Sequence, residues 1–137
     1  MIYPMFAMVL LTAFVLAKLF RTRVGAVRQG LVSAAYFRIY QGELEPEPSA
    51  KLTRHFSNLF EVPVLFYVVC LAAMIAHITG PAMQALAWIY VAARGVHAYV
   101  HLGGNRIRRR LRAYFFSCFV LLAMWIYLVA GVALSAP

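Results

Sequence analysis

Four long apolar runs constrain this chain more than any other feature. They cover roughly residues 3–20, 54–78, 83–102 and 113–134, and a helix of about 20 residues crosses the hydrocarbon core of a bilayer. Hydrophobic residues make up 64% of the 137-residue chain, whereas about half is typical of soluble domains. We therefore predict an all-α integral membrane protein, a four-transmembrane-helix bundle that forms a single domain over residues 1–137.

The basic residues give this bundle an orientation. The formal net charge is +9, and most Lys and Arg residues lie in or next to the segments 21–53 and 103–112. Because cytoplasmic loops carry an excess of Lys and Arg, we predict that both segments are cytoplasmic and that both termini lie outside. The same clustering, without zinc-ligand spacing or a recognition-helix pattern, argues against nucleic acid as a partner. Membrane lipids are the expected surroundings.

The segment 21–53 also holds three of the four acidic residues, Glu43, Glu45 and Glu47. Together with two nearby prolines, they are typical of a solvated loop in which neighbouring charges balance. We expect no second domain in this segment.

Polar residues enter the second apolar run at its predicted cytoplasmic end. In the stretch "RHFSNLFEVP", Arg54, Asn58 and Glu61 are spaced i, i+4 and i+7 and would share one helix face. Glu61 is the only acid in any of the four runs, and an ionisable side chain at that depth is a functional candidate by default. We expect His55 and His77, near the two ends of this run, to lie at the membrane interfaces.

The third and fourth runs carry matching polar residues. Arg94, His97 and His101 are spaced i, i+3 and i+7 in the cytoplasmic half of the third run. Arg110 and Tyr114 are spaced i, i+4 at the start of the fourth. Since successive spans alternate in direction, three predicted helices direct polar side chains toward the same layer of the membrane.

This polar layer has competing interpretations. Glu61 could pair with Arg94 or Arg54 and merely hold the helices together. The cationic and hydrogen-bonding side chains outnumber the single acid, however, and this excess favours an anionic ligand. A metal site or proton relay could use His97, His101 and Glu61, but the adjacent arginines oppose a cation and no HExxH motif is present. We predict no metal.

These motifs resemble the MAPEG family, the membrane-associated proteins in eicosanoid and glutathione metabolism. The resemblance rests on the four runs, on "RHFSNLFEVP", and on "RGVHAYVHLGGNRIRRRLRAY", which begins at Arg94. It extends over nearly the whole chain and implies a homotrimer of four-helix subunits. Glutathione, the implied co-substrate, would bind between neighbouring subunits near the cytoplasmic face. The chain looks like a bacterial member, which implies the bacterial inner membrane.

The resemblance also implies roles for individual residues in glutathione binding. Arg54, Asn58 and Glu61 match positions that hold the polar ends of the tripeptide. Arg94 and His97 match positions that support it from the third helix.

Further site residues follow from the same resemblance. Arg110 matches the arginine with which glutathione-transferring members stabilise the thiolate, and a nearby guanidinium favours that charged form. Tyr114 follows at the family's spacing, and Arg21 matches a further basic contact at the end of the first helix. His101 stands where glutathione-using relatives often carry a tyrosine.

The predicted function is therefore a membrane-bound glutathione-dependent transferase or peroxidase acting on a lipophilic electrophile. The alternative is a non-catalytic membrane module, either a lipid-binding protein or an accessory subunit of a larger membrane complex. The basic stretch "NRIRRRLR" suits anionic lipid headgroups and is compatible with that alternative.

Overall fold

The computed structural model describes residues 1–42, 44–104 and 106–135, and this part of the chain contains helices and no strand. The helices are α1 (Ile2–Arg28), α2 (Tyr36–Ile39), α3 (Glu47–Asn58), α4 (Val62–Ile75), α5 (Pro81–Leu102) and α6 (Ile107–Ser135). The predicted all-α class is confirmed. Of the three acids predicted in the first loop, Glu43 lies outside the described residues.

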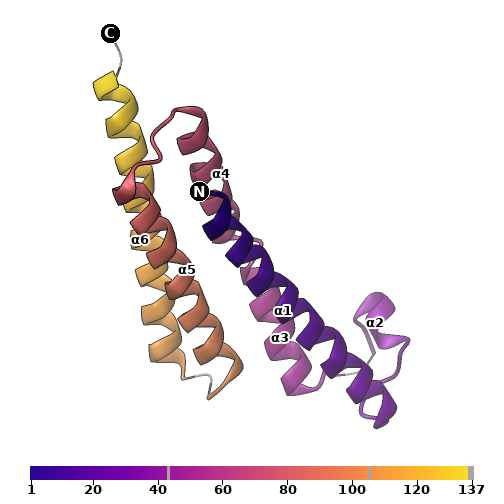
Figure 1. Ribbon diagram of the computed structural model, residues 1–137. Coiled ribbons are helices and arrows are strands. Elements are labelled where there is room, and N and C mark those ends of the chain that lie inside the picture. Colours follow the sequence, from indigo (N-terminus) through magenta and orange to yellow (C-terminus); the bar gives the residue numbers. More distant parts are fainter. Residues whose placement is uncertain (43, 105, 136–137) are drawn as a thin grey trace.

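The long helices form an elongated antiparallel bundle (Figure 1). α1 packs along α3, α5 packs along α6, and α4 contacts both α1 and α6. The ends of α1 and α5 and the starts of α3 and α6 lie at one end of the bundle, while the end of α4 lies at the other. The short α2 lies beyond α1 and α3, on the side away from α5 and α6.

Three segments of the described chain are long and apolar enough to cross a membrane, namely α1, Glu47–Ile75 and α6. α5 takes the place of the third predicted span but is not among them, because its polar residues, including Gln84, Arg94 and two histidines, lower its mean hydropathy. Between 22% and 33% of the residues in the three apolar windows are buried within the chain. Most of these residues are therefore at least partly exposed, and lipid or another protein chain can contact them.

The helices extend beyond the apolar runs. α1 continues to Arg28 and α3 begins at Glu47, so the segment between them is shorter than the predicted loop 21–53. α6 likewise begins at Ile107, ahead of the apolar run from residue 113. Hydropathy marks the part of a helix suited to hydrocarbon, whereas basic side chains at a helix end can extend into the polar headgroup region.

The second apolar run does not form one continuous helix. α3 ends at Asn58 and α4 begins at Val62. Pro63 accounts for the break, because proline has no N–H for the carbonyl four residues earlier and its ring clashes with that carbonyl. Glu61 lies in the break with a non-helical backbone. The expectation that Arg54 and Glu61 share one helical face is therefore wrong.

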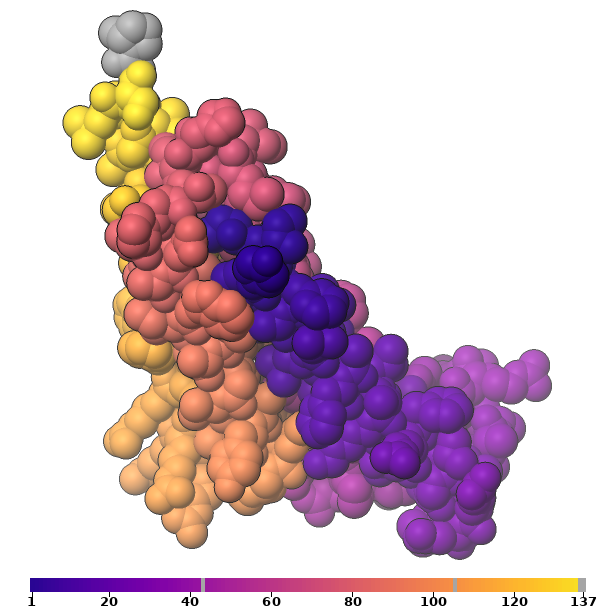
Figure 2. All heavy atoms as spheres, in the orientation of Figure 1, coloured from indigo at the N-terminus to yellow at the C-terminus, as the bar shows by residue number. Residues whose placement is uncertain are grey.

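The core lies where α1, α4, α5 and α6 meet. Phe66 and Tyr90 stack with their ring centroids 4.4 Å apart, and Met8 and Met124 are fully buried beside them in the same apolar cluster. Many large apolar side chains are instead more than half exposed, among them Phe14, Phe20, Phe119 and Ile126. The space-filling view in Figure 2 shows that the molecule broadens from the yellow end of α6 toward the opposite end of the bundle. Exposure on this scale marks surfaces that contact a membrane or other chains.

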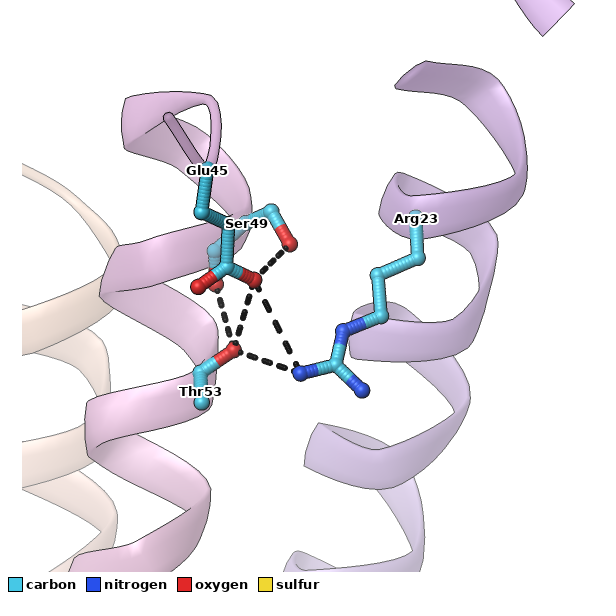
Figure 3. A network of polar contacts seen from close by, with 4 residues as sticks. All are labelled: Arg23, Glu45, Ser49 and Thr53. Carbon is cyan, nitrogen blue, oxygen red and sulfur yellow. Dashed lines mark hydrogen bonds and ion pairs between the residues drawn. The ribbon is translucent and has the colours of Figure 1, made fainter. Parts of the chain in front are cut away.

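A polar network joins α1 to α3 (Figure 3). Nη2 of Arg23 donates to Oγ1 of Thr53 at 2.9 Å and lies 3.7 Å from Oε1 of Glu45. The Glu45 carboxylate also accepts hydrogen bonds from the hydroxyls of Ser49 and Thr53. Contrary to the prediction of a solvated loop acid, the Glu45 side chain is 12% exposed. We call Arg23, Glu45, Ser49 and Thr53 the α1–α3 network.

Candidate functional site

The polar residues predicted on the third run lie on the buried face of α5. Arg94 is fully buried, and His97 and His101 are each 2% exposed. Their spacing continues the stripe of buried residues that includes Ala87 and Tyr90. Burying a guanidinium and two imidazoles on one stripe costs free energy unless polar partners meet them.

His55 of α3 completes a group of three imidazole rings. It is fully buried, and its ring centroid lies 4.8 Å from that of His101 and 5.4 Å from that of His97. His55 therefore belongs to the buried polar group, a place that the sequence did not predict for it, and its depth in the membrane stays a prediction. Its spacing from two buried leucines, Leu52 and Leu59, would have indicated the inward face, since positions i−3 and i+4 share one side of a helix.

Arg94 connects α5 to the end of α3. Its Nη2 donates to the backbone carbonyl of Asn58 at 3.2 Å. This carbonyl is available because the last four carbonyls of a helix have no partner within it, and α3 ends ahead of Pro63. The guanidinium also lies over the ring of Tyr114, 5.9 Å from its centroid. The helix break thus supplies an acceptor for a buried cation.

Arg110 reaches the same place from the start of α6. Its Nη1 donates to Nε2 of His101 at 3.4 Å. Because a guanidinium carries donors and no acceptor, His101 must present Nε2 as an acceptor and carry its proton on Nδ1. One turn along α6, the ring of Tyr114 lies 5.8 Å from that of His97. The predicted Arg110–Tyr114 pair therefore faces the polar stripe of α5.

We call His55, Arg94, His97, His101 and Arg110 the histidine–arginine cluster. It contains three imidazoles, two guanidiniums and no carboxylate. Several of its buried nitrogens find no hydrogen-bond partner among the described residues: both ring nitrogens of His55, Nε and Nη1 of Arg94, and Nδ1 of His97 and of His101. An unpaired buried polar atom costs about 1–3 kcal/mol, so the cluster is suited to accept a further polar group.

Three predicted site residues lie outside this cluster. Arg21, Arg54 and Glu61 are exposed. Within the described ranges, no ion pair joins Glu61 to Arg54 or Arg94, although Glu61 is close enough to Arg94 for its negative charge to favour the guanidinium cation. These three side chains are open to solvent, a ligand or another chain.

The three histidines raise the question of a metal site. In the part of the chain that the structure describes, no three His, Cys, Asp or Glu side chains are arranged to hold a metal ion. The imidazoles instead lie among guanidiniums, whose positive charge suits an anion.

Apolar helices of membrane length around a buried polar cluster define an integral membrane protein. The model of the MAPEG family matches residues 1–130, and the chain belongs to this family. No curated protein sequence and no solved structure matches the chain. The family match confirms the resemblance that the motifs indicate and connects the chain to glutathione-related membrane proteins.

Proposed function

We propose that the protein is a glutathione-dependent transferase or peroxidase that acts on a lipophilic electrophile. In this proposal α5 is a fourth membrane span and three chains assemble into a homotrimer in a bacterial inner membrane. The basic loops face the cytoplasm and both termini lie outside. The histidine–arginine cluster then lies near the cytoplasmic side, where glutathione is supplied.

The composition of the histidine–arginine cluster carries this proposal. It combines buried cationic and hydrogen-bonding groups with no acid, and Arg94 and His55 retain unpartnered nitrogens. Glutathione brings two carboxylates and one amine. Charge-assisted hydrogen bonds from guanidinium to carboxylate are about twice as strong as neutral ones, so an anionic tripeptide relieves the unpaired donors of Arg94.

The other predicted contacts extend this site. Asn58 and Tyr114 are half-buried beside Arg94 and line the ligand together with His97. Arg21, Arg54 and Glu61 are exposed, and we assign them to the part of the site that opens toward a neighbouring subunit. As the only acid of this group, Glu61 is the partner for the glutathione amine.

Arg110 has the catalytic role in this proposal. Its positive charge favours the thiolate of glutathione over the thiol, which releases its proton to solvent. The sulfur lone pair then forms a bond to the electrophilic carbon, and the leaving group departs with its bonding electrons. Electrostatic stabilisation by one positioned donor contributes about a hundredfold to a thousandfold in rate. The lipophilic acceptor arrives from the bilayer along the apolar helix faces.

Calorimetric titration of the purified protein in detergent with glutathione tests the proposal. We expect glutathione to bind the wild type in a single saturable isotherm. In a separate activity assay, we expect the wild type to turn over a chloronitroarene and Arg110→Ala to lose this turnover. Arg108→Ala, which removes an exposed arginine of the same helix, should retain turnover. No saturable binding to the wild type would overturn the proposal.

The non-catalytic alternative is favoured by one contact. Arg110 donates to His101, at a position where glutathione-using relatives often carry a tyrosine, so its guanidinium is engaged within the chain. Phospholipid that co-purifies between the helices, or a partner subunit that survives gentle detergent, together with no turnover of electrophiles or hydroperoxides, would favour this alternative.

A further inference from the structure

A groove of about 610 Å³ lies between α5 and α6. Its walls are apolar along most of their length, with Ile89, Ala92, Val96 and Phe116 among the lining residues. Arg109 and Arg112, in the first two turns of α6, line it as well. No residue of the histidine–arginine cluster lines this α5–α6 groove, so it is a separate feature of the molecule.

A smaller cavity of about 290 Å³ adjoins the basic end of the groove. The two share Val100 and Arg109 in their linings. The smaller cavity is more polar than the groove, because Arg106, Tyr99 and the glycines at the end of α5 line the rest of it. The combined depression therefore passes from an apolar trough into a basic pocket at the end of the α5–α6 hairpin, the orange end of the molecule in Figure 2.

The apolar part of the groove has the length of one lipid chain. An α-helix rises about 1.5 Å per residue, so Ile89 lies about 16 Å along α5 from Val100. The hydrocarbon core of a bilayer is about 30 Å thick, so one leaflet contributes about 15 Å. An acyl chain that begins at the basic pocket would therefore fill the trough to its far end.

The positive charge of the basic pocket favours a lipid over a second copy of this chain as the occupant of the groove. The sequence has 13 Lys and Arg residues and 4 acids, so a second copy offers few counter-charges. Glu45 and Glu47 already lie beside Arg23 and Lys51, which leaves Glu61 as the one described acid outside an ion pair. A phosphate group supplies the missing negative charge, and its oxygens can accept two parallel hydrogen bonds from one guanidinium.

We propose that the α5–α6 groove is a binding site for one anionic phospholipid. The phosphate contacts Arg109, Arg106 and Arg112, and an acyl chain occupies the trough along α5. The site selects anionic over zwitterionic lipids because the described residues that line it include arginines and no acid. This inference does not depend on glutathione chemistry.

Native mass spectrometry of the full chain in detergent tests the site, with phosphatidylglycerol and phosphatidylcholine of identical acyl chains as probes. We expect one tightly bound phosphatidylglycerol per chain, held at least about tenfold more tightly than phosphatidylcholine. Arg109→Gln should weaken phosphatidylglycerol binding about fivefold, and Arg109→Gln with Arg112→Gln about thirtyfold. Val96→Trp, which fills the trough, should weaken both lipids.

The matched control is Arg108→Gln, which removes the same charge from the neighbouring position outside both cavities. It should leave the preference for phosphatidylglycerol unchanged. Equal binding of the two lipids to the wild type, or equal losses in Arg108→Gln and Arg109→Gln, would overturn the proposal. A change in oligomeric mass in Val96→Trp without a change in lipid binding would assign the groove to another copy of the chain and would overturn it as well.

Discussion

The chain contains two buried polar regions that differ in one respect, the presence of an acid. In the α1–α3 network, Arg23 meets the carboxylate of Glu45, and two hydroxyls complete the contacts. In the histidine–arginine cluster, Arg94 meets a backbone carbonyl and retains two buried nitrogens without a partner among the described residues. Nε of Arg23 also has no partner among the described residues, but the charge of Arg23 is balanced by Glu45 within the chain. In the second region Arg94 has no such carboxylate, so that region is suited to receive charge from a ligand.

This difference separates a structural role from a binding role. Removing one partner from a balanced buried pair leaves an uncompensated charge and lowers stability. Removing a cation that has no carboxylate partner relieves a desolvation cost instead. Substitutions in the α1–α3 network should therefore lower stability, and substitutions in the histidine–arginine cluster should lower ligand binding or turnover.

The largest expected effect is on catalysis in the histidine–arginine cluster. Arg110→Gln should lower the rate of glutathione transfer about a hundredfold to a thousandfold, because one electrostatic stabiliser of the reacting sulfur is lost. Steady-state kinetics with a chloronitroarene measures this, and Arg108→Gln is the control. A rate within twofold of the wild type would remove Arg110 from the reaction.

The next effect is on stability in the α1–α3 network. Arg23→Met should lower the free energy of unfolding by about 2 kcal/mol, since the carboxylate of Glu45 loses its counter-charge while remaining largely buried. Lys51→Met is the matched control, because its partner Glu47 is 88% exposed, and surface pairs contribute about 0–1 kcal/mol. Denaturation followed by tryptophan fluorescence compares the two, and equal losses would contradict the assignment of Arg23 to a structural pair.

A smaller effect is expected where Arg110 meets His101. In the catalytic proposal the hydrogen bond between them positions the Arg110 guanidinium. His101→Phe removes the acceptor and should lower turnover about tenfold, the effect of roughly one charge-assisted hydrogen bond. His101→Gln, which can present an amide oxygen, should retain most of the rate. If both variants behave alike, the ring contacts of His101 matter more than this hydrogen bond.

The smallest effect is expected at His55. Its two ring nitrogens have no partner among the described residues, so His55→Phe keeps the ring and removes unpaired polar atoms. The free energy of unfolding should change by less than about 1 kcal/mol or rise, because an apolar ring of similar shape replaces a desolvated polar one. A loss larger than about 2 kcal/mol would mean that water or another buried group bonds the imidazole.

Much of this fold could be predicted because a run of about 20 apolar residues predicts a membrane helix at that place in the chain. The order of the long helices and the face that carries Arg94, His97 and His101 follow from run length and spacing, and the family assignment is confirmed. The count of four spans and the trimer stay predictions. α5 is the uncertain span because it carries the polar residues of the site.

Other features required three-dimensional contacts. The break between α3 and α4 interrupts a run whose hydropathy predicts a single span, although Pro63 is its visible cause. Glu45 looked like a loop acid because its partner Arg23 lies on another helix, and only packing brings the two together. The burial of His55 beside His97 and His101 was missed, because a histidine near the end of an apolar run was expected to face outward, while its spacing from Leu52 indicated the inward face.

The central claim is that the histidine–arginine cluster is a ligand site rather than a brace. Thermal unfolding of the wild type and of Arg94→Met, each with and without glutathione, tests it most directly, since a ligand stabilises the folded state by an amount set by its affinity. We predict that glutathione raises the midpoint of the wild type and leaves that of Arg94→Met unchanged, while the variant without ligand is at least as stable as the wild type. A variant that is strongly destabilised, or that responds to glutathione as the wild type does, would contradict the account.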